Sequence, residues 1–321
     1  MTLLAAKPPE TITGTVIAAP VDTLTARVFA SPRMVIGGSI LLAIVLACCL
    51  STIWTLNRDG RFYFDRQNSA EVRTPPAGDV VHWFGTDSLG RSILARCLLG
   101  GTISLAVGAA AALISVFLGV TVGLFAGYRG GWTDSLLMRS VDILYGLPYI
   151  LLVILFKIAF EPLLGRKLSP QTANVVILFS AIGLVSWLTM ARVVRGQVLS
   201  LRSQPFIEAA KALGLPESRI FLRHILPNLI GPITVYATLT VPAAILQESF
   251  LSFLGVGIAA PLPTWGSLAS EGLLPALNPL NSLWWMLLFP CALLVVTLLS
   301  LNFVGDGLRD VFDPKRDQAK I

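Results

Sequence analysis

The sequence predicts an all-α membrane protein with about six transmembrane helices, and both composition and apolar run length indicate this class. Of the 321 residues, 55% are hydrophobic and only 13% are charged, with a mean hydropathy of +0.76. Soluble globular domains carry about 25% charged residues. Six apolar runs are each long enough to cross roughly 30 Å of hydrocarbon as a helix. They lie at residues 34–54, 103–127, 141–160, 175–191, 236–258 and 284–304.

Basic residues predict the orientation of these spans, because lysine and arginine are held on the cytoplasmic side during insertion. With the N-terminus inside, the cytoplasmic segments hold 15 of the 24 Lys and Arg residues and the external segments hold 8. Lys157 lies within the third span. We therefore expect a multi-pass chain of the cytoplasmic (inner) membrane with both termini in the cytoplasm. The net charge of +6 then needs no nucleic-acid partner.

This topology divides the chain into five parts. The expected parts are a cytoplasmic N-terminal tail (1–33), the first span (34–54), an external loop (55–102), a core of five spans (103–304) and a cytoplasmic C-terminal tail (305–321).

The external loop is predicted to contain a helix of its own. Asp87 or Ser88 is well placed to cap it, and the Gly100-Gly101 pair is expected to end it. Apolar residues at helical spacing share one side. We expect this amphipathic helix to lie along the outer membrane surface.

Two of the core spans carry residues that indicate their packing. Gly119, Gly123 and Gly127 repeat every four residues in the second span, so they form a smooth strip that lets another helix approach closely. Pro242 lies inside the fifth span, where we expect a kink.

The polar segment 196–232, between the fourth and fifth spans, is predicted to form a helix, a glycine turn and a second helix. Pro205 suits the first turn of the first helix, and Gly214 suits the position just past its end. The second helix starts near Pro216 and is expected to stop at Pro227. Its Arg219 and Arg223 share one face, and the apolar face of the first helix is formed by Phe206, Ala209, Ala210 and Leu213.

This segment resembles the EAA loop of the membrane subunits of ABC importers. The matching positions are Glu208, Ala209, Ala210, Gly214, Leu226 and Pro227. Strings at 84–105, 248–272 and 301–315 are similar to those of the second permease subunit of dipeptide, oligopeptide and nickel importers. The matches cover most of the chain from Phe84 onward, whereas residues 57–81 match no motif.

The resemblance implies the type I ABC importer permease fold, with a cytoplasmic coupling-helix loop that docks on an ATPase. It also implies a heterodimer with a related permease, two cytoplasmic ABC ATPase subunits that bind ATP and Mg, and an external solute-binding protein. Peptides are the expected cargo because they are the commonest in this subfamily, and nickel chelates are the alternative. The residues expected to contact the ATPase are Glu208, Ala209, Ala210, Leu213, Gly214, Arg219, Arg223 and His224.

Gln247 and Glu248 lie in the outer half of the fifth span, where an ionisable group is costly unless paired, hydrated or protonated. Two interpretations stay open. Either both side chains line a hydrated translocation path, or Glu248 bonds to a neighbouring helix.

The sequence indicates no catalytic role for the chain. It contains no G-x-x-x-x-G-K-[ST] phosphate-binding loop, and the two histidines, His82 and His224, are expected on opposite sides of the membrane. The four cysteines have neither zinc-site nor disulfide spacing. We therefore expect no catalytic residue, no metal site and no cofactor bound by this chain. The rival classes are an ion-gradient-driven secondary transporter, for which only Glu248 and Lys157 begin to qualify, and a membrane assembly protein.

Overall fold

The protein is a bundle of long helices in a computed structural model that describes residues 31–312. Five helical stretches are long and apolar enough to cross a membrane, and a sixth crossing is formed if one bent pair of helices counts as a span. Within the described residues the only β-type pairing is a single bridge between Thr86 and Ser92. The predicted all-α class with about six spans is therefore confirmed.

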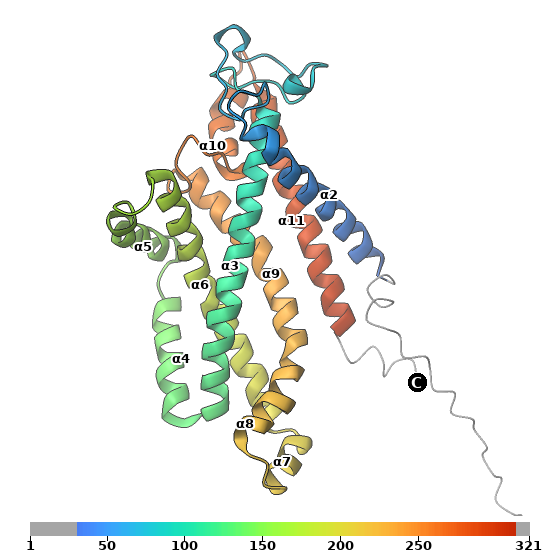
Figure 1. Cartoon of the computed structure of the whole chain (residues 1–321), viewed down its shortest axis with the longest axis vertical. Helices are drawn as coiled ribbons and strands as arrows, with labels where there is room; N and C mark the ends of the chain where they lie inside the picture. The colour runs from blue at the N-terminus through green and yellow to red at the C-terminus, as the bar shows by residue number, and fades with distance from the viewer. Residues whose placement is uncertain (1–30, 313–321) are drawn as a thin grey trace, which may run out of the picture.

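The spanning helices differ in length and direction. They are α2 (Pro32–Thr55), α3 (Ile93–Arg129), α6 (Pro170–Arg202), α9 (Leu226–Phe253) with the turns that precede it, and α11 (Trp284–Phe312). The short helices α7 (Pro205–Ala212) and α8 (Glu217–Ile220) lie at one end of the bundle, and α10 (Trp265–Ala276) lies at the other. We call these the α7 end and the α10 end (Figure 1). The first residues of α2 and the last residues of α11 both point toward the α7 end.

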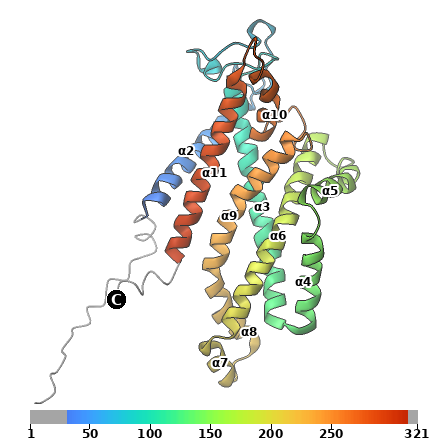
Figure 2. The same cartoon turned by 180° about the vertical axis from the view of Figure 1, so that it is seen from behind.

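Helices α3 and α6 run side by side through the centre of the bundle, as the two opposite views show (Figures 1 and 2). An added Cβ atom at Gly119, Gly123 or Gly127 would lie 2.5–2.8 Å from atoms of Met190, Ala191 or Val198 on α6. Real Cβ atoms do not approach so closely. The predicted smooth glycine strip is therefore the surface against which α6 packs.

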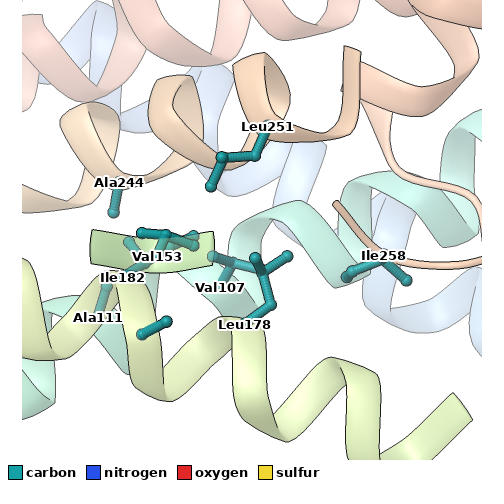
Figure 3. Close-up of a cluster of buried hydrophobic side chains, with 9 residues drawn as sticks. Val107, Ala111, Val153, Leu178, Ile182, Ala244, Leu251 and Ile258 are labelled. Atoms are coloured by element: carbon teal, nitrogen blue, oxygen red, sulfur yellow. The ribbon is translucent and has the colours of Figure 1, made fainter. Parts of the chain in front are cut away.

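A second region of the core joins α3, α6 and α9 to the bent pair. Figure 3 shows side chains of these helices meeting there, and they are almost fully buried. The cluster contains Val107, Ala111, Val153, Leu178, Ala181, Ile182, Ala244, Leu251 and Ile258.

The predicted third span is not one helix. Helix α4 (Gly131–Tyr145) ends before Gly146, and α5 (Tyr149–Leu164) starts after Pro148 with a direction that differs by 95°. Pro148 lacks the N–H that a continuous helix needs, and it pushes Leu147 out of the helical region. The apolar run in the sequence continues across this break because Leu147 is itself apolar, so the run alone does not reveal the break.

The external helix predicted between Asp87 and Gly101 is wrong in both boundaries. Helix α3 starts at Ile93, with Ser92 as its cap, and continues through the glycine pair to Arg129. An added Cβ at Gly101 would lie 2.5 Å from the ring of Trp265. Both glycines therefore let α3 pack against the start of α10, and they do not end a helix.

Other predicted spans ended before the real helix ends. Polar residues at a helix end lower the hydropathy although the backbone there is still helical. Helix α6 extends to Arg202, and α11 runs to Phe312 through the first part of the predicted C-terminal tail. Residues 1–30 and 313–321, and the predicted tails that include them, lie outside the described residues. Helix α10 was not predicted, although Thr264 and Ser267 form the capping box that begins it.

Candidate functional site

Helix α7 forms the tip of the α7 end, and Ala210, which we predicted to contact the ATPase, faces the bundle instead. Pro205 occupies its first turn, as expected. Ile207 and Ala210 are buried against the bundle, at 0% and 5% exposure. Phe206 and Leu213 are exposed, Leu213 at 81%. The predicted apolar face is therefore divided, and part of it is open to a partner.

The glycine turn after α7 is confirmed. Gly214 has a φ of +70°, and its N–H donates to the carbonyl of Lys211 at 2.9 Å. The N–H of Leu215 donates to the carbonyl of Ala210 at 3.2 Å. These two bonds make a Schellman motif, which requires the left-handed conformation at the glycine position. No atom outside its own turn lies within 4 Å of the place that a Gly214 side chain would occupy.

The second short helix does not stop at Pro227. Helix α8 passes into a π turn, Phe221–Ile225, which runs directly into α9. In this turn the N–H of Leu226 donates to the carbonyl of Phe221. The wider turn shifts the hydrogen-bond ladder just before Pro227, which has no N–H to contribute. One unbroken helical path therefore leads from the tip of the α7 end into the bundle.

The α7 end is packed firmly on the long helices. Ile207, Ala210, Ile220 and Ile225 form one buried cluster with residues of α3, α6 and α9. The Tyr128 hydroxyl on α3 donates to the carbonyl of Glu217 at 3.1 Å. Displacement of α7 and α8 must therefore carry the attached helices with it.

The remaining predicted contact residues form the outer surface of this end. Glu208, Ala209, Arg219 and Arg223 are exposed, and His224 is half-buried. Within residues 31–312, none of the four charged or ionisable side chains among these five residues has an ion pair. The surface thus offers a carboxylate, two guanidinium groups and the apolar Leu213 to a partner.

Glu248 is fully buried in the bundle, at 0% exposure. Its carboxylate accepts hydrogen bonds from Ser252 on α9 at 2.6 Å and from Ser104 on α3 at 3.2 Å. These contacts fit the interpretation in which Glu248 bonds to a neighbouring helix. Gln247 beside it is half-buried, and its Oε1 has no hydrogen-bond partner in the described part of the chain. The path role of the pair stays a prediction.

A partly buried group of charges at the α10 end was missed by sequence reasoning. Asp87 accepts from Arg91 Nε at 2.7 Å and from Arg96 at 2.9 Å. Arg96 also donates to Glu271 of α10 at 2.6 Å and 3.0 Å, and Arg91 donates to Asp65 at 3.0 Å. We call these five residues the rim cluster. It joins the loop 56–92 to the start of α3 and the middle of α10.

The rim cluster keeps Arg91 charged. Burial is the largest single influence on Arg91 and acts to lower its pKa, but Asp87, Asp65 and Glu271 together raise the pKa above the usual arginine value. Asp87, which we predicted as a helix cap, is the acceptor at the centre. Its spacing of four from Arg91 was the available signal.

Neither histidine lies in a group that could hold a metal. Within residues 31–312, no three His, Cys, Asp or Glu side chains are close enough to bind one. His82, in the loop at the α10 end, contacts Glu71 at 3.1 Å, whereas His224 lies in the π turn at the α7 end.

Comparison with known proteins identifies relatives of this chain. Residues 119–318 match the family model described as binding-protein-dependent transport system inner membrane component. The dipeptide transport system permease protein DppC of Bacillus subtilis is 46% identical over 250 residues, which are 78% of this chain and 73% of that protein. The oligopeptide transport system permease protein OppC of Escherichia coli K12 is 46% identical over 255 residues, 79% of this chain and 80% of that protein.

A solved structure has the same fold. An inward-facing conformation of the MetNI methionine ABC transporter matches with a TM-score of 0.51 and 19% sequence identity, over 68% of this chain and 97% of that one. This confirms the predicted permease fold of type I ABC importers. The family match covers more than half of the chain, and both permeases exceed 40% identity over most of its length. The chain therefore belongs to the family of binding-protein-dependent transport system inner membrane components.

Proposed function

We propose that this chain is one of two related permease subunits in an ATP-driven importer of di- or oligopeptides in the inner membrane. Two cytoplasmic ABC ATPase subunits and an external solute-binding protein complete the complex. The observation that carries the proposal is the α7 end, an exposed surface of Glu208, Leu213, Arg219 and Arg223 packed on the three long helices α3, α6 and α9. The names of the relatives support peptides as cargo.

The excess of basic residues in the segments of the α7 end supports its placement in the cytoplasm. An ATPase can then reach it, and both chain termini are cytoplasmic as well. Glu208 bonds to the ATPase, Leu213 supplies apolar contact, and Gly214 sets the angle between the two short helices. Arg219, Arg223 and His224 complete the docking surface.

Coupling is mechanical in this proposal. The ATPase subunits bind ATP and Mg, and this chain binds no cofactor and has no catalytic residue. Closure of the ATPases displaces α7 and α8. Because α8 is continuous with α9, and α7 follows α6 after two residues, the displacement tilts both spans as rigid bodies.

The test is reconstitution of the whole importer. The chain is co-expressed with the neighbouring permease, ATPase and binding-protein genes, and uptake of trialanine into proteoliposomes is measured. We expect stoichiometric ATPase subunits in the purified complex and uptake that requires ATP and the binding protein. Uptake driven by an ion gradient without ATPase would refute the proposal and favour a secondary transporter. Uptake of a nickel chelate in place of peptide would support the ATP-driven mechanism and would replace peptide by the chelate as the proposed cargo.

A further inference from the structure

A cavity of about 730 Å³ lies at the α10 end, between the loop 56–92 and the turn that joins α10 to α11. Its volume is within the range of small-molecule sites, which is about 300–1,000 Å³. Arg73 lines one side. The other side is lined by Leu274, Asn278, Asn281, Leu283 and Trp285.

The cavity presents solvent-exposed hydrogen-bond donors, Arg73, Asn278 and Asn281, that are free to bind a ligand. In the described part of the chain, the Arg73 guanidinium forms no ion pair and the Asn281 side chain forms no hydrogen bond. Asn278 uses its Oδ1 to accept from the N–H of Leu280 at 3.0 Å, so its Nδ2 remains available to donate to a ligand. None of the described lining residues is acidic. The cavity therefore favours a ligand with a negative charge and further acceptor atoms.

Arg73 is held in an unfavourable backbone conformation. Its φ of +57° is the only positive φ at a non-glycine residue among residues 31–312. Such strain persists only where the surroundings impose it, and it is common at ligand sites. Here the Arg73 N–H donates to the carbonyl of Asp87 at 3.0 Å, and the Thr74 N–H donates to Thr86 Oγ1 at 2.8 Å.

The two walls of the cavity are fixed to each other. Trp285 Nε1 donates to the carbonyl of Thr86 at 3.2 Å, which ties α11 to the segment that holds Arg73. The rim cluster adds a second tie through Asp87 and Glu271 of α10. The backbone of Arg73 is therefore fixed relative to the opposite wall before any ligand arrives.

We propose that this cavity binds the C-terminal end of the peptide cargo at the external mouth of the permease, an inference that rests on the proposed peptide import. Arg73 pairs with the terminal carboxylate, since a guanidinium fork matches that group. Asn278 and Asn281 donate to carbonyl oxygens of the peptide, and Leu283 with Trp285 forms the apolar wall. The rival occupant is an acidic side chain of the external binding protein.

The test compares trialanine with trialanine amide, which lacks the carboxylate charge. Binding of each to the complete importer in nanodiscs, without binding protein, is measured by ligand-observed NMR. We expect the wild type to bind trialanine about tenfold more tightly, as a charge-assisted hydrogen bond allows. Arg73→Gln should remove the preference. Arg58→Gln, at an exposed arginine of the same loop that does not line the cavity, should keep it.

A folding defect in Arg73→Gln is addressed by Arg73→Gly, because glycine accepts the positive φ and removes the whole side chain, guanidinium included. Equal binding of both peptides by the wild type, no binding of either, or an unchanged preference in both Arg73 variants would overturn the proposal. Weaker association of the binding protein with Arg73→Gln and an unchanged peptide preference would assign Arg73 to the rival interface. Uptake of trialanine into proteoliposomes is measured in parallel, and its absence in the wild type would instead refute the proposed function.

Discussion

At the scale of single residues, Gly214 determines how the α7 end is shaped. Its positive φ allows the two hydrogen bonds that close α7, and open space surrounds the place of its missing side chain. A substitution there strains the backbone without a clash inside this chain. Gly255, at the end of α9, has a φ of +78° and equally open surroundings, but it lies toward the α10 end.

We expect Gly214→Asp to leave membrane insertion and complex yield intact while it lowers peptide-stimulated ATPase activity and uptake by about tenfold or more. The backbone strain costs about 1–2 kcal/mol in either glycine variant. Only Gly214→Asp places a carboxylate on the proposed docking surface, so Gly255→Asp serves as the matched control. Equal losses in both variants would show that strain, and not docking, is responsible. Full uptake with Gly214→Asp would argue against the docking assignment.

Glu248 can be tested with the same assays. In Glu248→Gln the amide oxygen can still accept from Ser252 or Ser104, so we expect a stability loss of about 1–2 kcal/mol and unchanged uptake. Thermal unfolding of the purified complex and uptake into proteoliposomes are the measurements. Ser104→Ala, which removes the bond from α3 to Glu248 and the acceptor of the Trp265 N–H at 3.4 Å, is the control for helix bonding. A normal unfolding temperature with lost uptake would instead support the path role of Gln247 and Glu248.

At the scale of helices, the packing of α3 on α6 depends on the glycine strip. An added Cβ at Gly123 would meet the backbone carbonyl of Ala191 at 2.6 Å, and a backbone atom cannot move aside as a flexible side chain can. Gly196 on α6 has no atom within 4 Å of its missing Cβ. The two positions therefore predict opposite effects of the same substitution.

We expect Gly123→Ala to destabilise the bundle by about 1–3 kcal/mol through overpacking. Gly196→Ala should be neutral or stabilise by up to about 1 kcal/mol, because alanine is the better helix former. The yield of folded protein and its thermal unfolding temperature in detergent give the comparison. Similar unfolding temperatures for both variants would contradict the close α3–α6 contact.

The sequence predicted the helices well where a local signal decides the structure. Long apolar runs located the spans, and Gly214 located the turn after α7, because each depends on residues close together in the chain. The break at Pro148 was missed, since its apolar neighbours continued the run. The Gly100-Gly101 pair was read as a helix end because its real reason, the close approach of Trp265, lies more than 160 residues away.

The candidate sites also differ in whether a local sequence signal could predict them. The proposed docking residues follow from a local motif. Phe206 and Leu213 of the predicted apolar face are exposed, whereas Ala210 of that face is buried together with Ile207. The rim cluster depends on Glu271 meeting Arg96, a contact that only the tertiary fold creates. Buried charges of this kind cannot be paired from a single sequence.

At the scale of the whole molecule, the two ends are held in different ways. Apolar packing fixes the α7 end on the bundle, whereas the α10 end combines an apolar cluster with the ion pairs of the rim cluster. Arg96 is 3% exposed and links Asp87 in the loop to Glu271 on α10. The order of the whole loop 56–92 should therefore depend on this one side chain.

We expect Arg96→Met to loosen that loop while the helices stay folded. Loss of one partner from a fully buried ion pair costs about 3–5 kcal/mol. The cost here should be smaller, because Arg91 still pairs with Asp87 at 2.7 Å and lies 3.6 Å from Glu271, which is 40% exposed. Hydrogen exchange of the complex in nanodiscs should show faster exchange across residues 65–92 and α10, with α6 and α9 unchanged. Arg61→Met removes an exposed pair with Asp79 at 3.5 Å, which contributes little in water, and should leave exchange as in the wild type. Faster exchange throughout the bundle would show that Arg96 supports the entire fold, and unchanged exchange in residues 65–92 would show that the rim cluster does not hold the loop.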